Sequence, residues 1–362
     1  MKIAVLVSGG VDSSVALALC VEKWGKDNIE AFYLKIWLED ELSYLGQCPW
    51  QDDLFYVESV CKQFDVKLNI MPLQREYFDK VVNYTIREIK AGRTPNPDIF
   101  CNQAIKFGAF ISKLAQEFSY KFDYVATGHY AQIEYINNLN LLKCSKDSVK
   151  DQTYFLAYLN QEQLSKVMFP IGHLTKFQVR ELAKQYDLPN MSRKDSQGIC
   201  FLGKLKFSDF IESYLGRNQG DLIEFETNKK LGEHNGFWFY TIGQRKAIGL
   251  SQGPWYVVAK DSEKNIVYIS CKDNKDNLYK NNLIISSLNW LNPLIKQDIE
   301  QNIDQVFDVK LRHSPKSYKA KLHKISDDKY KIDLDENDRS IAPGQFAVIY
   351  YKDYCVLSGI IN

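Results

Sequence analysis

The chain has 362 residues, more than one hydrophobic core usually organises, so two or three domains are expected. A composition of 45% hydrophobic and 25% charged residues excludes a disordered or low-complexity chain. The chain has 46 Lys and Arg residues and 45 Asp and Glu residues. The resulting net charge of +1 gives no sign of a nucleic-acid or membrane-surface partner. The charge is not evenly spread, however, because residues 101–220 carry 15 basic against 11 acidic side chains.

The N-terminal sequence and the cysteines indicate the compartment. The apolar run at residues 3–7 follows Met1 and Lys2 directly and is too short for a signal peptide or a membrane span. The 8 cysteines form no Cys-x-x-Cys pair, and their spread argues against both zinc ribbons and a disulfide scaffold. We expect a cytoplasmic protein without membrane contact, in which most cysteines, such as Cys20, are buried small hydrophobic residues.

In the first half of the chain, short β-branched or aromatic runs alternate with longer helical patterns. Strands are predicted at residues 3–7, 30–37, 67–72 and 124–127, the last before a polar Asn-rich turn at 136–140. Helices are predicted at residues 13–24, 52–64, 75–91, 102–118, 174–185 and 208–215. Strands separated by helices are typical of an α/β fold with a doubly wound parallel sheet.

Beyond about residue 216, Gly and Asn turns separate short apolar runs. Residues 237–240 are predicted to form an apolar strand, and residues 256–270 a hairpin that turns at 261–265. From residue 283 onward no helix is predicted, and a small all-β barrel or sandwich is indicated by strands at 306–311, 318–323, 330–335, 346–350 and 355–360. We predict three domains, at residues 1–216, 217–280 and 281–362.

The strongest motif is Ser8-Gly9-Gly10-Val11-Asp12-Ser13-Ser14, between the first strand and the first helix. Its adjacent glycines let the backbone turn tightly and present N–H groups to an anion at a helix N-terminus. Asp12 suits a phosphate site if a Mg²⁺ ion lies between its carboxylate and the phosphates. The motif is neither G-x-G-x-x-G nor a Walker sequence. It resembles the PP-loop of ATP pyrophosphatases, which transfer AMP from ATP to an acceptor.

Two cysteines have unusual neighbours. Cys101 follows Thr94-Pro95-Asn96-Pro97-Asp98 and precedes a predicted helix that carries Lys106. A thiol at a helix N-terminus near a cation is expected to ionise more readily. Cys200 ends the segment Asp195-Ser196-Gln197-Gly198-Ile199-Cys200, shortly after two basic residues. Both cysteines are therefore candidate reactive thiols.

Several motifs occur together in the order expected for one family: Ser8–Ser14, Gly92–Phe107, Ala126–Tyr130, Lys150–Phe155, Asp195–Leu202 and Pro343–Gln345. They resemble those of the tRNA-specific 2-thiouridylases of the MnmA type, which place sulfur on C2 of the wobble uridine. The match covers nearly the whole chain. It implies that an ATP-binding catalytic domain is followed by a central and a β-barrel domain that both bind tRNA.

The resemblance also implies residue roles. Cys200 would accept sulfur as a persulfide, and Cys101 would help to release it, ending in a Cys101–Cys200 disulfide. The residues implied at ATP are Leu6, Val7, Ser8, Gly9, Gly10, Val11, Asp12, Ser13, Leu34 and Gly128. The residues implied at the target base are Asn96, Pro97 and Asp98. Those implied at the tRNA surface are His129, Lys150, Asp151, Gln152, Arg312, His313 and Gln345.

The implied reaction uses ATP and Mg²⁺, and takes persulfide sulfur from a donor protein, a cysteine desulfurase or a relay. Adenylation turns the C2 oxygen of uridine into a leaving group, because it then departs with AMP. The sequence leaves open whether the persulfide or a released hydrosulfide attacks C2. The family suggests a monomer acting on the tRNAs for Lys, Glu and Gln.

Two alternatives are weighed against this reading. Another PP-loop enzyme, such as an amide-forming synthetase acting on a small molecule, would need neither Cys101 nor Cys200. An RNA-binding module that merely retains a nucleotide site would release no pyrophosphate. In addition, residues 42–53 resemble the form seen in cyanobacterial and plastid-type members, so a plastid stroma stands beside the bacterial cytoplasm as a possible compartment.

Overall fold

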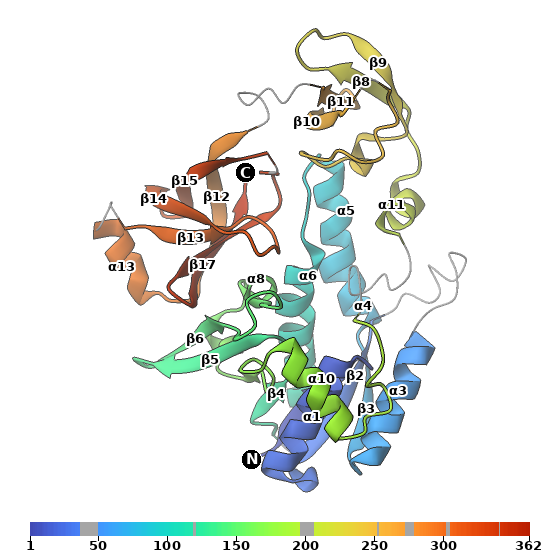
Figure 1. Ribbon diagram of the computed structural model, residues 1–362, viewed down its shortest axis with the longest axis vertical. Coiled ribbons are helices and arrows are strands. Elements are labelled where there is room, and N and C mark those ends of the chain that lie inside the picture. The colour runs from blue at the N-terminus through green and yellow to red at the C-terminus, as the bar shows by residue number, and fades with distance from the viewer. Residues whose placement is uncertain are drawn as a thin grey trace.

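The structure is a computed structural model that describes residues 1–36, 50–118, 121–195, 206–251, 253–271, 279–301, 305–339 and 341–362. The predicted catalytic Cys200, and most of the segment 42–53, lie outside these residues. Figure 1 shows an N-terminal α/β unit beside a β-barrel, with a small central sheet at the far end of the molecule from the N-terminus.

The N-terminal sheet has five parallel strands within the described residues, in the order β3-β2-β1-β4-β7. The strands are β1 (Ile3–Leu6), β2 (Ile29–Lys35), β3 (Lys67–Pro72), β4 (Tyr124–Ala126) and β7 (Val167–Met168). Every residue of β1 is buried, because helices cover both faces, and each such aliphatic side chain stabilises the fold by roughly 1.5–3 kcal/mol. The chain winds to one side of β1 and then returns to the other, so the predicted doubly wound sheet is confirmed.

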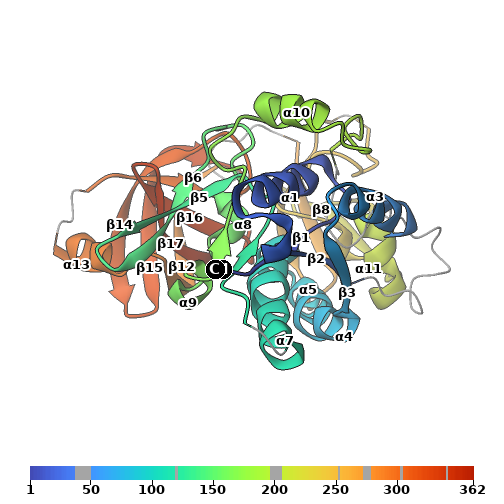
Figure 2. The same cartoon turned by 90° about the horizontal axis from the view of Figure 1, so that it is seen from below.

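Helices pack on both faces of this sheet (Figure 2). One face is covered by α1 (Val11–Trp24), α3 (Trp50–Gln63) and α10 (Lys176–Gln185). The other face is covered by two long helical runs: α4 (Gln74–Tyr77), η3 (Phe78–Val82) and α5 (Asn83–Lys90), then α6 (Pro97–Phe100), η4 (Cys101–Ala109) and α7 (Phe110–Glu117). The segments η3 and η4 are π-helical, a geometry that is often found at functional sites.

The second run differs from its prediction at its start. It begins at Pro97 rather than residue 102, because Pro97 suits the first turn of a helix and Asn96 caps it, with Oδ1 accepting the Ile99 N–H at 3.4 Å. Cys101 therefore lies inside the helix, not at its N-terminus. Short elements complete this part of the chain: η1 (Lys26–Asn28), α8 (Thr153–Leu156), α9 (Gln161–Leu164) and α11 (Phe207–Leu215).

A hairpin from the N-terminal half joins the C-terminal sheet. Its strands are β5 (Ala131–Ile136) and β6 (Leu139–Cys144), and the predicted Asn-rich turn holds Asn137 and Asn138 at φ 51° and 62°. These values suit a two-residue type I′ turn, for which Asn is favoured. Strand β6 pairs with β17 (Tyr354–Ile361), so the α/β unit and the barrel share one sheet.

The central sheet consists of β8 (Gly220–Glu224), β9 (Lys230–His234), β10 (Tyr256–Asp261) and β11 (Ile266–Ser270). The predicted hairpin is confirmed, because β10 and β11 are antiparallel. The strand predicted at residues 237–240 is wrong: η5 (Phe237–Phe239) is a 3₁₀ turn. Side chains take its backbone donors, since Asn265 Oδ1 accepts the Phe237 N–H and His234 Nδ1 accepts the Gly236 N–H.

Within the described residues, six antiparallel strands close the barrel, because β12 pairs with both β15 and β17. They are β12 (Lys280–Trp290), β13 (Phe307–Lys310), β14 (Tyr318–Ser326), β15 (Lys329–Asp338), β16 (Phe346–Tyr351) and β17. The prediction of an all-β segment was wrong in one respect, the helix α13 (Leu294–Gln301). Its Ile295 and Ile299, one turn apart, are buried in the barrel core.

Candidate active site

The site lies where the winding of the sheet reverses, at the carboxyl ends of β1 and β4. Residues 8–14, the phosphate loop, follow β1, and Gly128 follows β4. A Cβ atom on Gly128 would lie 2.7 Å from both the Asp12 carbonyl carbon and the Ser13 nitrogen. Only a glycine lets the two loops pack this closely. Ligands bind at such switch points in open α/β sheets.

Hydroxyl groups hold the phosphate loop in shape. The Ser8 N–H donates to Ser13 Oγ at 3.2 Å. The Ser13 and Ser14 hydroxyls both donate to the Gly10 carbonyl, at 3.0 and 3.1 Å. Gly10 is the N-cap of α1 and, within the described residues, no side chain caps that end. The first N–H groups of α1 are thus directed at the place where a phosphate would bind.

Two distant side chains brace the loop at Gly9, which has a φ of +75°. Asn190 Nδ2 donates to the Gly9 carbonyl at 2.8 Å and to Ser14 Oγ at 2.9 Å. Arg193 Nη1 donates to the same carbonyl at 2.9 Å, and its other nitrogen pairs with Asp53 of α3. A Cβ on Gly9 would lie 2.6 Å from the Asp53 carbonyl oxygen. The phosphate loop is therefore held by side chains of other elements as well as by its own hydroxyl groups.

Asp12 already carries a cationic partner. Lys176 Nζ lies 2.7 and 2.9 Å from the two carboxylate oxygens of Asp12, and the Tyr130 hydroxyl donates to one of them at 2.9 Å. Burial raises the pKa of Tyr130, and the neighbouring Asp12 carboxylate raises it further. Tyr130 is therefore a neutral donor at physiological pH.

Asp195 collects three cations beside the loop. Its carboxylate oxygens lie 2.8 Å from Lys150 Nζ, 2.7 Å from Lys176 Nζ and 2.6 Å from Arg180 Nη2. Burial opposes ionisation, but the hydrogen bonds from Lys150 and Lys176 outweigh it and hold the pKa of Asp195 well below its usual range. This cluster places three cationic side chains at the rim of the phosphate loop.

The remaining residues predicted at ATP lie around the loop. Leu6 and Val7 are buried at the end of β1, and Val11 is buried in the first turn of α1. Leu34 is half-buried near the end of β2, the strand that neighbours β1. All ten residues predicted at ATP are thus gathered at one edge of the sheet.

The predicted base-contacting residues form a second loop. Residues 92–98, the base loop, lead into α6, and Cys101 begins η4 with 1% of its surface exposed. Asn102, next to it, donates to the Phe155 carbonyl at 3.0 Å, while its buried Oδ1 has no partner among the described residues. Phe107 of η4 packs against His129, which adjoins Gly128. The helix of Cys101 therefore reaches the edge that holds the phosphate loop.

The barrel clamps the base loop. Gln345 Nε2 donates to the carbonyl oxygens of Thr94 and Pro95, at 2.9 and 3.2 Å, and the Thr94 N–H donates to the Pro343 carbonyl at 2.7 Å. Gly344 has a φ of +91°, and a Cβ there would lie 3.0 Å from the Thr94 nitrogen. Gln345 was predicted at the tRNA surface, and the structure places it against this loop.

The segment Lys150-Asp151-Gln152 lies between the two loops and the barrel. Lys150 reaches Asp195, whereas Gln152 Oε1 accepts the Tyr130 N–H at 2.9 Å. Asp151 is 4% exposed and accepts from Thr153 Oγ1 at 2.7 Å and Lys310 Nζ at 3.2 Å. Its buried carboxylate therefore connects Thr153 of the α/β unit with Lys310 of the barrel.

The three other residues predicted to contact tRNA, Arg312, His313 and His129, differ in solvent exposure. Arg312 and His313 are exposed; Arg312 lies 3.2 Å from Asp338, and His313 stacks 4.5 Å from the Phe155 ring. His129 Nδ1 lies 2.7 Å from Thr127 Oγ1. Burial, and then the nearby Lys106 ammonium, hold the pKa of His129 well below its usual value. This histidine is therefore neutral at physiological pH.

Sequence reasoning missed residues that meet the loops from far along the chain. These are Lys176, Arg180 and Asn190; Tyr130 was noted only as part of the motif Ala126–Tyr130, and Arg193 only as a neighbour of Cys200. Lys176 and Asp12 are 164 positions apart, so no spacing links them. One signal was present: Thr175 and Gln178 form a capping box, which marks Lys176 as the first residue of a helix.

Among the other described cysteines, Cys20, Cys61 and Cys355 are buried, as expected of small hydrophobic residues, whereas Cys144 and Cys271 are half-buried. Burial raises the pKa of Cys20, Cys61 and Cys144 to about 12 in each case. These thiols stay protonated and unreactive at neutral pH. Among the described residues no group of three His, Cys, Asp or Glu side chains could hold a metal ion.

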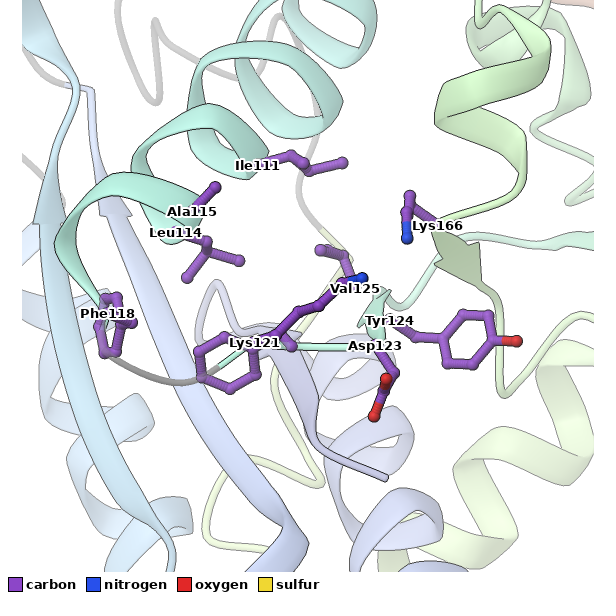
Figure 3. Close-up of a pocket in the computed structure, with 10 residues that line it drawn as sticks. Ile111, Leu114, Ala115, Phe118, Lys121, Asp123, Tyr124, Val125 and Lys166 are labelled. Carbon is purple, nitrogen blue, oxygen red and sulfur yellow. The ribbon is translucent and has the colours of Figure 1, made fainter.

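A cavity of about 430 Å³ lies at the opposite edge of the sheet (Figure 3). Phe118, Phe122 and Tyr124 line it with aliphatic residues of α7, near the start of β4. Because β1 and β4 are parallel, this edge is remote from the phosphate loop, and the cavity is not part of the site. None of the helices described here is long and apolar enough to cross a membrane.

Three family models match successive parts of the chain. They are the tRNA methyl transferase HUP domain at residues 1–204, the tRNA methyl transferase PRC-barrel domain at 208–271 and the aminomethyltransferase beta-barrel domain at 280–361.

Curated relatives match over the full length. The tRNA-specific 2-thiouridylase MnmA of Parabacteroides distasonis is 44% identical over 100% of this chain and 99% of its own. That of Porphyromonas gingivalis is 43% identical with the same coverage, and MnmA 1 of Bacteroides thetaiotaomicron is 43% identical over 100% of both chains. Among solved structures, the U34-tRNA thiolase NcsA from Methanococcus maripaludis aligns at 18% identity and a TM-score of 0.35, over 59% of this chain and 64% of that one.

Proposed function

The chain belongs to the tRNA-specific 2-thiouridylase MnmA family and catalyses the ATP-dependent 2-thiolation of the wobble uridine of tRNA, and we propose how its residues divide that reaction. The observation that carries the proposal is that the helix that carries Cys101 and follows the base loop packs, through Phe107, against His129 beside the phosphate loop. The full-length match to the 2-thiouridylases favours thiolation over the two alternatives, an amide-forming synthetase and a non-catalytic RNA-binding module.

The phosphate loop binds ATP. The free N–H groups at the start of α1 receive the phosphates, and Leu34 and Gly128 border the nucleotide. The Asp12 carboxylate, at the rim of the loop, is the kind of oxygen ligand that Mg²⁺ prefers, so the site fits a metal-bound triphosphate. When bound, Mg²⁺ supplies charge stabilisation at the phosphates. The C2 oxygen of uridine attacks the α-phosphorus, and the bond to pyrophosphate breaks.

The base loop presents the uridine. Asn96, Pro97 and Asp98 lie at the start of α6, where the prolines stiffen the backbone and Asn96 is committed to the helix cap. The wobble base must leave its stack to reach them, as is usual for chemistry on a nucleobase. The conformation of the base loop is then largely set before tRNA binds, because the barrel already holds Thr94 and Pro95.

Cys200 and Cys101 transfer the sulfur. In one route the terminal sulfur of a Cys200 persulfide attacks C2 and AMP leaves; the Cys101 thiolate then attacks the Cys200 sulfur and releases the thiolated base. In the other, Cys101 attacks first and frees a hydrosulfide, which displaces AMP at C2. Both routes end in a Cys101–Cys200 disulfide, which an external dithiol reduces. The persulfide comes from a donor protein, either a cysteine desulfurase or a relay.

The tRNA backbone contacts the exposed Arg312 and His313 of the barrel. Arg312 is cationic and His313 can donate a hydrogen bond, and contacts with phosphate use such groups. Lys150, His129, Gln152 and Gln345 line the path from these residues to the base loop. Asp151, being buried, contributes by fixing Lys310 and Thr153. We propose a monomer in the bacterial cytoplasm acting on the tRNAs for Lys, Glu and Gln, since the relatives are bacterial.

Replacing each cysteine tests this division. Cys101→Ser and Cys200→Ser are expected to lower 2-thiouridine formation by at least about a thousandfold, because the hydroxyl is neither a sulfur acceptor nor a comparable nucleophile. Release of pyrophosphate with cognate tRNA should persist in both variants, because adenylation of the base precedes sulfur transfer. The control is Cys61→Ala, a change at an equally buried thiol on α3. Mass spectrometry of tRNA nucleosides reads out the product, and retained thiolation in either Ser variant contradicts the two-cysteine mechanism.

A further inference from the structure

The Lys176 ammonium lies between two carboxylates at the rim of the phosphate loop. Its nitrogen is 2.7 Å from Asp12 Oδ1, 2.9 Å from Asp12 Oδ2 and 2.7 Å from Asp195 Oδ1. The side chain is 15% exposed, so little water competes for these contacts. Asp12, which we propose as the Mg²⁺ ligand, therefore has both oxygens engaged by a cation of the protein itself.

The backbone of Lys176 is fixed. Thr175 caps α10 in a capping box with Gln178, and the Lys176 N–H donates to Asp147 Oδ2 at 2.8 Å. Asp12 is fixed as well, by the first turn of α1 and by the Tyr130 hydroxyl. The flexible part of the pair is the four-carbon stem of the lysine.

An ammonium group and a divalent cation compete for the lone pairs of the same carboxylate oxygens, and their like charges repel at contact distance. Because Lys176 already engages both oxygens of Asp12, we expect its ammonium to leave Asp12 when the metal arrives. Asp195 keeps it at the rim of the loop, where the nearest new anion is the triphosphate.

We propose that Lys176 neutralises Asp12 in the nucleotide-free enzyme and moves to a phosphate oxygen of ATP when Mg²⁺ binds Asp12. The inference rests on the proposed nucleotide site. In this arrangement Asp12 does not repel the incoming nucleotide. The displaced ammonium then stabilises the charge that develops on pyrophosphate as its bond to the α-phosphorus breaks.

The first test uses Mn²⁺ alone, titrated by electron paramagnetic resonance against the nucleotide-free enzyme. Lys176→Gln removes the competing ammonium and should tighten Mn²⁺ binding at least about threefold. The matched control is Lys150→Gln, which removes the same charge from the same cluster, because Lys150 contacts Asp195 and not Asp12. This control should change Mn²⁺ affinity less than twofold.

The second test measures binding of α,β-methylene-ATP at saturating Mg²⁺. Lys176→Gln should weaken it about tenfold, the loss expected for one charge-assisted hydrogen bond. Lys176→Arg keeps the charge and should recover part of that loss. Thermal unfolding of each variant identifies any that fails to fold, and Lys176→Arg then serves both titrations.

Unchanged or weakened Mn²⁺ binding in Lys176→Gln overturns the proposal, because the ammonium would then only support the position of Asp12. Equal shifts in Lys176→Gln and Lys150→Gln overturn it too, since they indicate a general electrostatic effect. Unchanged affinity for the analogue overturns the move to phosphate. Failure of the proposed function is distinguishable, because wild-type enzyme would then form no AMP with tRNA, whatever the titrations give.

Discussion

The phosphate loop and the base loop are linked through the helix of Cys101, whose Phe107 contacts His129, but the two loops are held in place by different means. Charged and amide side chains of the α/β unit fix the phosphate loop, through Asn190, Arg193 and Lys176. The base loop is fixed by the barrel, through hydrogen bonds between Gln345 and the loop carbonyls. Nucleotide chemistry thus depends on electrostatics within one unit, whereas presentation of the base depends on contact between two.

This difference has a structural reason. Phosphate binding needs positive charge and free N–H groups, which a helix N-terminus and its neighbours supply locally. A flipped base needs a rigid surface at a fixed distance from the phosphates, and the barrel supplies it because it shares a sheet with the α/β unit. Damage to each loop should therefore appear in a different measurement.

Among changes that separate the two loops, the largest effect is expected from Gly128→Ala. A Cβ there would lie 2.7 Å from backbone atoms of Asp12 and Ser13, which cannot move aside without distorting the phosphate loop. Isothermal titration should show MgATP affinity lowered by at least about a hundredfold, since a misplaced loop loses several phosphate hydrogen bonds of roughly 1.5–3 kcal/mol each. Affinity for tRNA should stay within twofold.

Gly25→Ala is the control for this change. Gly25 also has a positive φ, of 78°, but a Cβ there meets no atom within 4 Å. The substitution should lower stability by roughly 1–3 kcal/mol, because side chains rarely adopt a φ of 78° with a ψ of 144°, and should leave MgATP affinity unchanged. Equal loss of ATP affinity in both variants would contradict the close packing of Gly128 as the cause.

A smaller effect is expected from Gln345→Ala. The change leaves the Thr94 and Pro95 carbonyls without their side-chain donor and loosens the base loop. Single-turnover thiolation should slow about tenfold, consistent with two hydrogen bonds of roughly 0.5–1.5 kcal/mol each, while MgATP affinity is unchanged. Gln185→Ala, at an exposed position of α10, is the control. A loss confined to tRNA affinity would contradict the clamp and favour a direct tRNA contact for Gln345.

The smallest effect concerns Lys260 of the central sheet, which belongs to neither loop. Burial lowers the pKa of Lys260 to about 8, although its ammonium donates to the Tyr240 carbonyl at 2.9 Å. The unfolded chain, with an ordinary lysine pKa near 10.4, binds this proton more tightly, so stability rises as the pH increases from about 8 to 10. Below pH 8 both states are protonated and the penalty is complete.

Lys260→Met removes this penalty. Its stability advantage over wild type, measured by urea unfolding, should be largest at pH 7 and shrink as the pH approaches 10. MgATP binding and thiolation should be unaffected, because the residue lies outside both loops. An advantage that does not vary with pH would show that the lysine is solvated and carries no such penalty.

Much of the fold followed from local patterns. Four of the five strands of the parallel sheet, the hairpin of the central sheet and most barrel strands were predicted because buried strands and turn residues are contiguous in sequence. Errors arose where tertiary contacts override local pattern. Asn265 and His234 turn residues 237–239 into a 3₁₀ segment, and the apolar pair Ile295 and Ile299 is too short a signal for α13.

The site was predictable only where its motif is contiguous. The phosphate loop and the neighbours of Cys101 were found because each lies within one stretch of chain. Lys176, Asn190 and Arg180 were not, because their partners are distant in sequence and long polar side chains are usually solvated. The burial of Asp151 could not be predicted from the sequence either, since its partner Lys310 belongs to the barrel.

The central claim is that the C2 oxygen of uridine leaves with AMP. Cognate tRNA carrying oxygen-18 at C2 of the wobble uridine tests it directly, in a single turnover with ATP, Mg²⁺ and a sulfur donor. Mass spectrometry should find the heavy oxygen in AMP, in equal amount to the 2-thiouridine formed. Unlabelled AMP accompanying 2-thiouridine would contradict adenylation of the base.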